Sequence, residues 1–257
     1  MISSWLVKIL KCPETGLQFD LVDGHLTRSD GKIFTDRDDI ISLVYPSSLS
    51  GADEKMNRLY ERIAPFYDFS ERIFGWILTG VNMQRGREEI VSLLNLKKNQ
   101  RLLEVSPGPG VFQPMLRNAL GDQSEIASLD LSFNMLAQCH KRFSKLNIEL
   151  IQGNAQYLPF ADESFDVLFH FGGVNLFNEP DRALCEFVRV VKKGGIVAWG
   201  DEQMSSDFRH PLGRLLLPHL NPGFLKTPPA IPQGIADLKK YTVYKGLGYL
   251  NVARKVN

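Results

Sequence analysis

The chain has 257 residues, of which 44% are hydrophobic and 10% aromatic, so it is long enough to bury the core of one sizeable α/β domain and a small addition. Its 30 basic and 29 acidic residues argue against a broad electrostatic surface for nucleic acid or anionic lipid, although a local basic face stays compatible with them. The longest apolar runs, Ile73 to Leu78 and Gly194 to Trp199, fall far short of the roughly 20 residues of a membrane span. The first ten residues lack the pattern of a signal peptide. The cysteines, Cys12, Cys139 and Cys185, are too dispersed for a disulfide framework, and we therefore expect a cytoplasmic protein.

Residues 1–46 are expected to fold as a small β-rich unit of their own. Short strand-like runs alternate there with Asp-Gly turns. A linker rich in turn-forming residues follows, and apolar residues then recur at helical spacing through residues 47–95, which predicts a helical lead-in to the main domain. The expected strands of the first unit are Leu17–Val22, His25–Thr27, Ile33–Phe34 and Ile40–Val44.

In residues 96–257 strand and helix signals alternate, which predicts an α/β fold with a mostly parallel, doubly wound sheet. An insert at about 205–232 is expected to form a lid, and a terminal β-hairpin should follow, with Tyr241–Tyr244 and Tyr249–Arg254 as its strands. Ser132 is the expected N-cap of one helix. The predicted parallel strands are Arg101–Val105, Glu125–Asp130, Ile148–Gln152, Phe165–Phe171 and Gly195–Gly200, and the predicted helices are Val111–Leu120, Phe133–Leu146 and Asp181–Val191.

The first strand-to-helix turn of this region, within LLEVSPGPGVF at residues 102–112, has the composition of a nucleotide-binding turn. Glycine allows a ligand to approach the backbone closely, because it has no Cβ. The dinucleotide pattern G-x-G-x-x-G fails at Gln113, and the Gly-Lys-Ser/Thr of a phosphate-binding loop is absent. A nucleoside with a charged amino-acid tail, S-adenosylmethionine, fits the remaining pattern.

Polar residues at three successive strand ends support this interpretation. Glu104 would favour the cationic methionine end, directly or through water. Asp130 lies 20 residues beyond Gly110, a spacing that suits a bidentate acceptor for ribose hydroxyls. Asn154 would hydrogen-bond the adenine edge, with Ala155 leaving room beside it.

Four stretches, LLEVSPGPG, SLDLSFNML, GNAQYLPFADESFDVL and EFVRVVKKGGIVAW, together resemble the class I S-adenosylmethionine-dependent methyltransferases. The closest pattern is the branch with quinone-biosynthesis C-methyltransferases and many small-molecule methyltransferases, and it covers about residues 55–254. The resemblance implies a seven-stranded sheet with an antiparallel last strand. Its members usually have glycine in place of Ser106 and aspartate in place of Asn154, and both replacements are compatible with binding. The cofactor residues that it implies are Glu104, Ser106, Gly108, Gly110, Asp130, Asn154 and Ala155. Pro107, within the turn, is a further candidate, and Leu131 and Met135 are expected to pack as apolar residues and to contact the adenine as a secondary role.

Residues 1–46 resemble the small zinc-ribbon domain that occurs as an activator of RNA and protein methyltransferases or fused to other methyltransferases. That domain usually has two C-x-x-C pairs, and the matching positions here are Cys12, Thr15, Thr27 and Asp30. One thiol in four cannot form a structural zinc site. We therefore expect a degenerate, metal-free ribbon.

The acceptor site is expected at the end of the fourth strand, where His170 is followed by Phe-Gly-Gly. This sequence differs from the Asn/Asp-Pro-Pro-Tyr/Phe of adenine-N6 and glutamine methyltransferases. His170 is a candidate general base, with a strand-end histidine bound to backbone as the alternative. Tyr67, in the helical lead-in, is a candidate for lining the site, with plain packing against the sheet as the alternative.

The leading hypothesis is a methyltransferase that acts on oxygen or carbon of a small, partly apolar acceptor. A ribosomal or transfer RNA methyltransferase is a first alternative, which the balanced charge and the missing zinc ligands do not favour. A non-catalytic cofactor-binding or partner-docking module is the second. The sequence leaves open whether the protein is a monomer or a homodimer.

Overall fold

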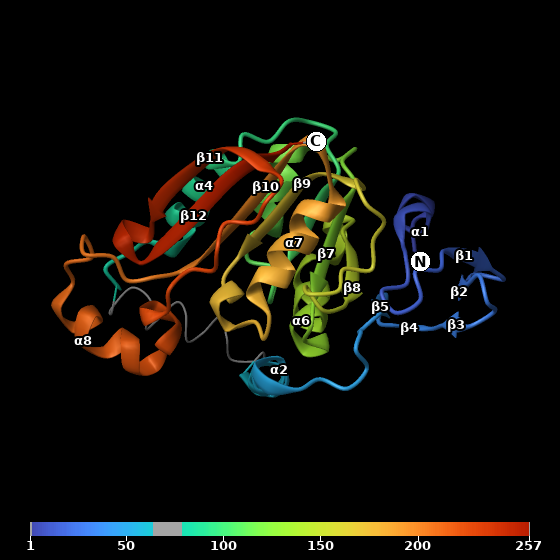
Figure 1. Cartoon of the computed structure of the whole chain (residues 1–257), viewed down its shortest axis with the longest axis horizontal. Coiled ribbons are helices and arrows are strands. Elements are labelled where there is room, and N and C mark those ends of the chain that lie inside the picture. Colours follow the sequence, from blue (N-terminus) through green and yellow to red (C-terminus); the bar gives the residue numbers. More distant parts are fainter. Residues whose placement is uncertain (1, 64–78, 257) are drawn as a thin grey trace.

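The computed structural model describes residues 2–63 and 79–256. Its centre is a twisted, mostly parallel sheet in the order β11-β12-β10-β9-β6-β7-β8-β5-β4 (Figure 1). The first seven strands in this order belong to the predicted α/β region. Their bounds are β6 Leu102–Val105, β7 Ile126–Asp130, β8 Glu149–Gln152, β9 Phe165–Phe171, β10 Val191–Glu202, β11 Ile235–Val243 and β12 Gly248–Lys255.

The pairing confirms the α/β prediction and the antiparallel last strand. Strands β6, β7, β8, β9 and β10 run parallel, whereas β12 pairs antiparallel with both β10 and β11. All four residues of β6 are buried, as expected for a central strand covered on both faces. The sheet order reverses beside β6, between β7 and β9. The carboxyl end of β6 is therefore the place where such sheets bind ligands.

Helices cover both faces of the sheet. Residues alternate between two cores along β6, since Leu102 belongs to one cluster and Leu103 to the other. Helix α7 (Pro180–Val190) contributes to the cluster of Leu103, and α4 (Met83–Leu93) and α5 (Gln113–Leu120) to that of Leu102. Helix α6 (Phe133–Phe143) follows β7, and the Ser132 Oγ accepts a hydrogen bond from the Met135 N–H, as an N-cap does.

The N-terminal segment shares the core and the sheet of the main domain. Helix α1 (Ser4–Ile9) precedes a three-stranded antiparallel sheet of β1 (Phe19–Val22), β2 (His25–Arg28) and β3 (Ile33–Phe34). Strands β4 (Asp36–Arg37) and β5 (Ile40–Ser42) instead extend the large sheet, with β5 parallel to β8. Leu6, Leu10 and Phe19 pack in the same cluster as Phe160. Residues 1–46 thus include one small sheet and one edge of the large one.

Two further helices lie around the carboxyl ends of the strands. Helix α2 (Gly51–Ile63) begins the lead-in, and Tyr67 lies outside the described residues. The insert after β10 contains α8 (Pro211–Leu220) and the short 3-10 helix η4 (Pro222–Leu225). Within the described ranges, the helices are all too short or too polar to cross a bilayer.

Candidate cofactor site

The turn after β6 combines three residues with positive φ. Ser106, Gly108 and Gly110 have φ values of 57°, 55° and 83°. A Cβ on Gly108 would meet nothing within 4 Å, whereas one on Gly110 would lie 2.6 Å from the Cys139 sulfur. Gly108 therefore keeps the turn open toward a ligand, and Gly110 allows α6 to pack closely beneath it. The left-handed backbone at Ser106 explains why glycine is usual at this position in the resembling family.

Asp130 joins this turn to the end of the neighbouring strand. Its Oδ2 accepts a hydrogen bond of 3.0 Å from the Gly108 N–H, and its Oδ1 accepts one of 2.9 Å from the Ser132 N–H. The carboxylate is half-buried and lies at the carboxyl end of β7. It is thus held in place where the sequence predicts a ribose acceptor.

Glu104 lies beneath the turn and is 1% exposed. Its side chain accepts a hydrogen bond of 3.0 Å from the Ser128 hydroxyl, and the Gln113 amide in turn donates to that hydroxyl over 3.1 Å. Burial raises the pKa of the Glu104 carboxyl to about 7, although hydrogen bonds from Ser128 and Gln113 act to lower it. A cation bound above the turn would favour the ionised carboxylate.

Asn154 and Ala155 follow β8, and both are buried. The Asn154 amide is already engaged, since its Oδ1 accepts hydrogen bonds from the Gln156 backbone and side chain and its Nδ2 lies 3.4 Å from Asp53 Oδ2. The Asp53 carboxylate on α2 also accepts bonds from the Gln156 amide, at 2.5 Å, and from the Asn178 N–H, at 2.9 Å. Asp53 and Gln156 therefore fasten α2 to the loop beside the predicted adenine position. The contact spans about a hundred residues of sequence, and no local signal reveals it.

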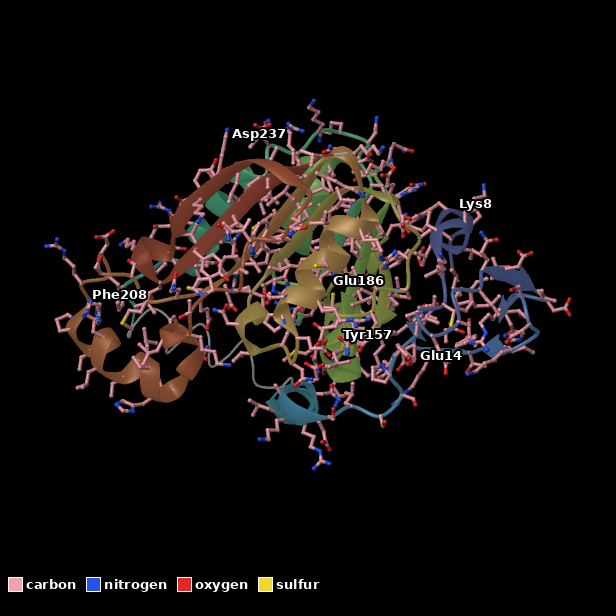
Figure 2. All side chains as sticks on the ribbon, in the orientation of Figure 1. Lys8, Glu14, Tyr157, Glu186, Phe208 and Asp237 are labelled. Atoms are coloured by element: carbon pink, nitrogen blue, oxygen red, sulfur yellow. The ribbon has the colours of Figure 1, made fainter. Side chains whose placement is uncertain are left out.

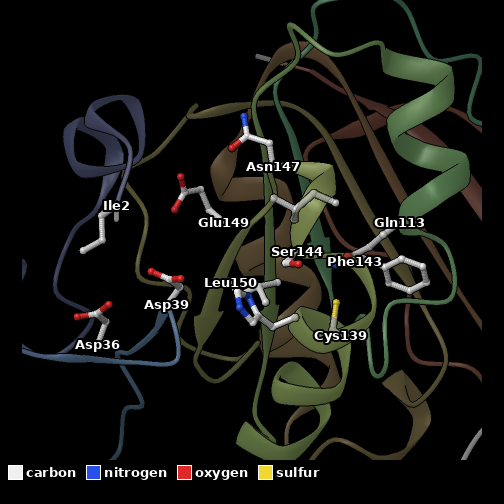
Figure 3. A pocket seen from close by; sticks show the side chains of 12 residues that line it. Ile2, Asp36, Asp39, Gln113, Cys139, Phe143, Ser144, Asn147, Glu149 and Leu150 are labelled. Carbon is white, nitrogen blue, oxygen red and sulfur yellow. The ribbon is translucent and has the colours of Figure 1, made fainter.

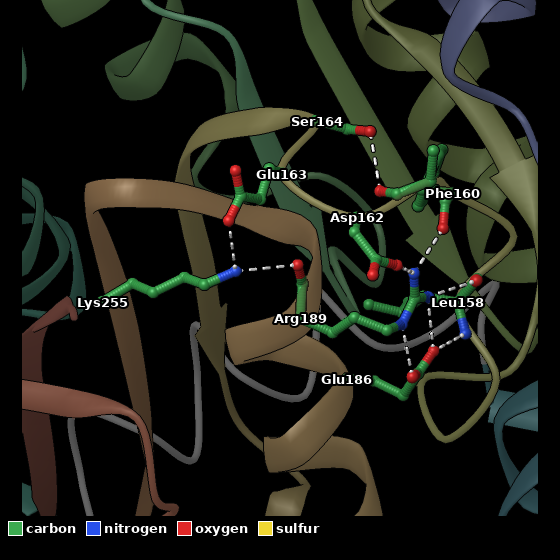
Figure 4. A network of polar contacts seen from close by, with 9 residues as sticks. Leu158, Phe160, Asp162, Glu163, Ser164, Glu186, Arg189 and Lys255 are labelled. Carbon is green, nitrogen blue, oxygen red and sulfur yellow. Dashed lines mark hydrogen bonds and ion pairs between the residues drawn. The ribbon is translucent and has the colours of Figure 1, made fainter. Parts of the chain in front are cut away.

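The far end of this loop is anchored to α7 by Arg189 (Figure 4). The guanidinium donates hydrogen bonds to the carbonyls of Leu158 and Phe160 and forms ion pairs with Glu186 and Asp162. Glu186 in turn accepts a bond from the Leu158 N–H. The network therefore fixes the position of the end of the loop that carries Asn154.

The remaining predicted cofactor residues also border the turn or the start of α6. Pro107 is buried within the turn, and Met135 is 2% exposed on the first turn of α6. Leu131 is half-buried, and its carbonyl accepts a hydrogen bond of 3.1 Å from the Gln152 amide. These positions supply the apolar surface that an adenine ring requires.

A separate small pocket lies between β4, α6 and β8 (Figure 3). Gln113 and Cys139 line it, and they also lie behind the glycine turn. Its other lining residues include Asp36, Asp39 and Glu149. The predicted cofactor residues do not line this pocket.

His170 is fully buried beside the turn. Its Nδ1 lies 3.0 Å from the Val105 carbonyl, which accepts a hydrogen bond from the Nδ1–H tautomer, and its ring packs against Phe177 and Phe187. Burial lowers the pKa of His170 to about 4. The Nε2 has no partner among the described residues. This environment stabilises the junction of β6 and β9 and gives the ring no exposed surface through which to reach a substrate.

A polar cluster missed by the sequence analysis occupies the carboxyl end of β10. The Asp201 carboxylate accepts hydrogen bonds from the backbone N–H groups of Gly173 and Asn175, at 2.8 and 2.7 Å. Burial raises the pKa of Asp201. The Tyr249 hydroxyl donates to Asn175 Oδ1 over 3.3 Å, and the Lys226 ammonium donates to the Asn175 carbonyl over 3.0 Å.

Within this cluster, the Asn175 Nδ2 is buried and has no partner among the residues that the structure describes. An unpaired buried amide donor costs free energy, which an acceptor oxygen that reached it would recover. Asp201 fixes the loop that carries it. The apolar-to-acid change within VAWGDE is the only sequence signal for this role, and it is weak.

Arg28 contacts two of the four positions that were compared with zinc ligands, Cys12 and Asp30. The Arg28 guanidinium donates to the Cys12 sulfur over 3.2 Å and forms two hydrogen bonds with Asp30, at 2.9 and 2.7 Å. Burial acts to raise the pKa of Cys12, but hydrogen bonds from Thr15 and Arg28 outweigh it and lower that pKa. Arg28 thus connects the first loop to the second.

The residues around the turn fit S-adenosylmethionine. Gly108 leaves open space where a side chain would otherwise stand, the Asp130 carboxylate is preorganised at a strand end, and the Glu104 carboxyl can ionise below a cation. The fold supplies the usual ligand position of a doubly wound sheet. Geometry and donor chemistry therefore agree.

Comparison with known proteins leads to the same class. Residues 103–199 match the family model described as a methyltransferase domain. This part of the chain is therefore similar to the class I S-adenosylmethionine-dependent methyltransferases, whose cofactor is S-adenosylmethionine.

Among curated proteins, the chain is similar to demethylmenaquinone methyltransferases. The chain is 34% identical over 152 residues to a demethylmenaquinone methyltransferase of Listeria monocytogenes serotype 4a, over 57% of this chain and 61% of the relative. A demethylmenaquinone methyltransferase of Geobacillus kaustophilus is 34% identical over 150 residues, with 56% and 61% covered. The chain therefore spans about three fifths of the length of these relatives.

Solved structures share the fold at low identity. A S-adenosylmethionine-dependent methyltransferase from Aquifex aeolicus has a TM-score of 0.53 and 19% identity, covering 80% of this chain and 100% of the other. Phosphoethanolamine N-methyltransferase 2 of Haemonchus contortus, in complex with S-adenosyl-L-methionine, has a TM-score of 0.61 and 16% identity, covering 83% and 62%. A chain from the complex between the Haloferax volcanii Trm112 methyltransferase activator and a putative methyltransferase has a TM-score of 0.56 and 13% identity, covering 77% and 98%.

Proposed function

We propose that this protein transfers the methyl group of S-adenosylmethionine to oxygen or carbon of a small, partly apolar acceptor of the hydroquinone type. The observation that carries the proposal is the pair of adjoining sites at the strand ends. The glycine turn and Asp130 form one, and the Asn175–Asp201 cluster forms the other. The similarity to demethylmenaquinone methyltransferases supports the acceptor class.

The proposed cofactor contacts follow the order of the strands. The turn residues Glu104, Ser106, Pro107, Gly108 and Gly110 border the methionine end, Asp130 binds the ribose, and Leu131, Met135, Asn154 and Ala155 surround the adenine. Of these, Glu104 acts from beneath the turn as a buried charge rather than as a direct ligand.

The reaction would be an in-line displacement, in which the bond from methyl carbon to sulfur breaks as the bond to the acceptor forms, and the acceptor would release its proton to solvent. Bound S-adenosylmethionine supplies an electrophilic methyl group on a positively charged sulfur. The contribution of the protein is alignment of the two reactants and exclusion of water. In this proposal the Asn175 Nδ2–H binds an acceptor oxygen, while Asp201 and Tyr249 hold the Asn175 backbone and side chain.

We also propose that residues 1–46 are a metal-free relative of the zinc ribbon. Arg28 takes the central position between the loops that metal ligands would otherwise join. Residues 47–95 act as the lead-in to the cofactor domain, and residues 205–232 as a lid over the acceptor side. Lys226 of this lid already contacts Asn175.

The proposal is tested first by calorimetric titration of purified protein with S-adenosylmethionine and its demethylated product. We expect micromolar binding that Asp130→Ala abolishes and that Asp122→Ala, an exposed acidic control, leaves unchanged. A mass-spectrometric assay with short-chain hydroquinones then measures methyl transfer, which Asn175→Ala should reduce at least tenfold without changing cofactor affinity. Failure of the folded wild type to bind the cofactor would overturn the proposed enzyme.

A further inference from the structure

Helix α8 lies at one extremity of the molecule, far from the N-terminal strands β1 to β3 (Figure 1), and it carries exposed apolar side chains. We define the leucine face as the exposed leucines of α8 and η4. Leu215, Leu220 and Leu225 are exposed to 63%, 68% and 69%. The full set is Leu212, Leu215, Leu216, Leu220 and Leu225.

The spacing of these residues explains the exposure. Leu212, Leu216 and Leu220 recur every four residues, and Leu215 follows Leu212 by three. The α8 leucines therefore share one side of the helix. Gly213 and Leu217 lie on the other side and are buried, the latter in the core cluster of Leu102. Helix α8 is thus apolar on both its inner and its outer side. The inner side is satisfied by packing, and the outer side faces solvent.

The charged residues within the segment that carries this face all have the same sign. Between Asp207 and Asp237 the sequence contains Arg209, Arg214 and Lys226 and no acidic residue. Phe208 and Asp237 mark the two limits of the segment in Figure 2. The whole chain has 30 basic and 29 acidic residues, so the three positive charges of this segment exceed what the overall composition would give. Exposed apolar side chains beside the exposed cations Arg209 and Arg214 are complementary to an anionic lipid surface.

The leucine face also adjoins the acceptor side of the proposed site. The Lys226 ammonium contacts the Asn175 carbonyl, the Phe224 carbonyl accepts a bond of 3.0 Å from the Met204 N–H, and Asn221 hydrogen-bonds Glu202. The segment that carries the leucines is therefore fixed to the end of β10, where the Asn175–Asp201 cluster lies.

We propose that the leucine face docks on the surface of an anionic lipid bilayer, with its leucines inserted at the level of the headgroups and Arg209 and Arg214 against the lipid phosphates. Membrane docking itself goes beyond the proposed function. Its consequence, that a lipid-soluble acceptor enters the site directly from the bilayer, rests on that function. Affinity should come from both the apolar contact and the cations, as in other amphipathic surface helices.

The test is sedimentation of the full-length protein with vesicles of phosphatidylcholine alone or with phosphatidylglycerol. Wild type should bind the anionic vesicles at least tenfold more tightly than the neutral ones. The double substitution Leu215→Glu/Leu216→Glu should weaken binding at least tenfold. A matched control, Val22→Glu/Ile33→Glu, changes two exposed apolar residues of the N-terminal sheet by the same charge and should bind within twofold of wild type. Arg209→Gln/Arg214→Gln should remove the preference for the anionic lipid.

Vesicle binding that survives Leu215→Glu/Leu216→Glu would overturn the proposal, as would a wild type that stays in the supernatant. Light scattering tests whether a second copy of the chain, rather than a bilayer, binds the leucine face. A dimer that becomes monomeric in the leucine variant, without vesicle binding, would assign the face to a second copy and equally overturn it. Calorimetry with S-adenosylmethionine runs in parallel, because docking can fail while cofactor binding succeeds, and the two proposals are then separated.

Discussion

The backbone N–H of Gly108 donates a hydrogen bond to the carboxylate of Asp130 over 3.0 Å, and this bond joins the turn after β6 to the end of β7. Both residues belong to the proposed cofactor site, so its methionine side and its ribose side are connected before any ligand binds. Such preorganisation reduces the ordering that binding must impose.

The two glycines of the turn should respond differently to alanine. At Gly108 a methyl group meets no atom within 4 Å, so Gly108→Ala should cost only about 1 kcal/mol of stability from its positive φ while obstructing the ligand. At Gly110 the same change collides with Cys139, and Gly110→Ala should lower the free energy of unfolding by about 3 kcal/mol or more. Urea unfolding and calorimetric titration measure the two effects. Equal stability loss in both variants would contradict the assignment.

Cofactor affinity should depend on the ionisation of Glu104. Its pKa is about 7 in the folded chain, so the carboxylate forms as pH rises through 7 and affinity for a cationic ligand should rise with it. Glu104→Gln should flatten this profile between pH 6 and 8 and weaken binding about tenfold at pH 8. The demethylated product, which lacks the sulfonium charge, serves as the control ligand and should show a smaller pH effect.

The same carboxyl should lower stability as pH rises from acid to neutral. A raised folded pKa means that the native state holds the proton more tightly than the unfolded state, so stability falls as pH rises from about 4.5 to 7. The fall is of the order of 3 kcal/mol at most, from about 1.4 kcal/mol per pKa unit. Relative to wild type, Glu104→Gln should therefore become more stable as pH rises through this window. An unchanged difference across the window in urea unfolding would refute the burial effect.

His170 provides the opposite case. Its pKa of about 4 lies below its ordinary value of 6.5, so the unfolded state takes up the proton first and wild-type stability falls as pH drops from 6.5 to 4. His170→Phe keeps the ring packing against Phe177 and Phe187 and should lessen this fall. The variant should retain methyl transfer within about threefold. Loss of kcat with normal folding would instead restore His170 as the general base.

The fold of the N-terminal sheet should depend on Arg28 rather than on zinc. Arg28→Met removes the hydrogen bonds to Cys12 and Asp30, and we expect the N-terminal sheet to become more sensitive to proteolysis. The Arg28 hydrogen bonds lower the pKa of Asp30 to about 2, so the pair persists at neutral pH. Lys32→Met, at an exposed neighbouring position, is the control. One equivalent of zinc in purified wild type, measured by elemental analysis, would contradict this account.

Local sequence patterns predicted the α/β elements because each central strand is a short apolar run between turn residues. Phe165–Phe171 agrees at both ends with β9, and the glycine turn lies where expected. The burial of Glu104 was not predicted, because a position at a strand end does not by itself show which face of the sheet a side chain occupies. The even spacing between Glu104 and Leu102, whose cluster includes α5, does indicate that face.

Long-range contacts explain the features that the sequence did not reveal. Asp53 reaches Asn154 across about a hundred residues, and nothing near either residue specifies the pair. Strand β5 has the pattern of a short hairpin strand, which is the same whether it pairs locally or at the edge of the large sheet. Helix α1 is only six residues long, too short for a clear periodic signal.

The position of β5 determines where this chain can be shortened. It covers β8, so deletion of residues 1–46 would leave the peptide groups of Leu150–Gln152 without their neighbours and uncover Phe160, which packs with Leu6 and Leu10. An open strand beside bare apolar surface invites self-association. A chain that lacks residues 1–46 would accordingly be prone to aggregate. The N-terminal segment prevents this by covering the β8 edge of the sheet.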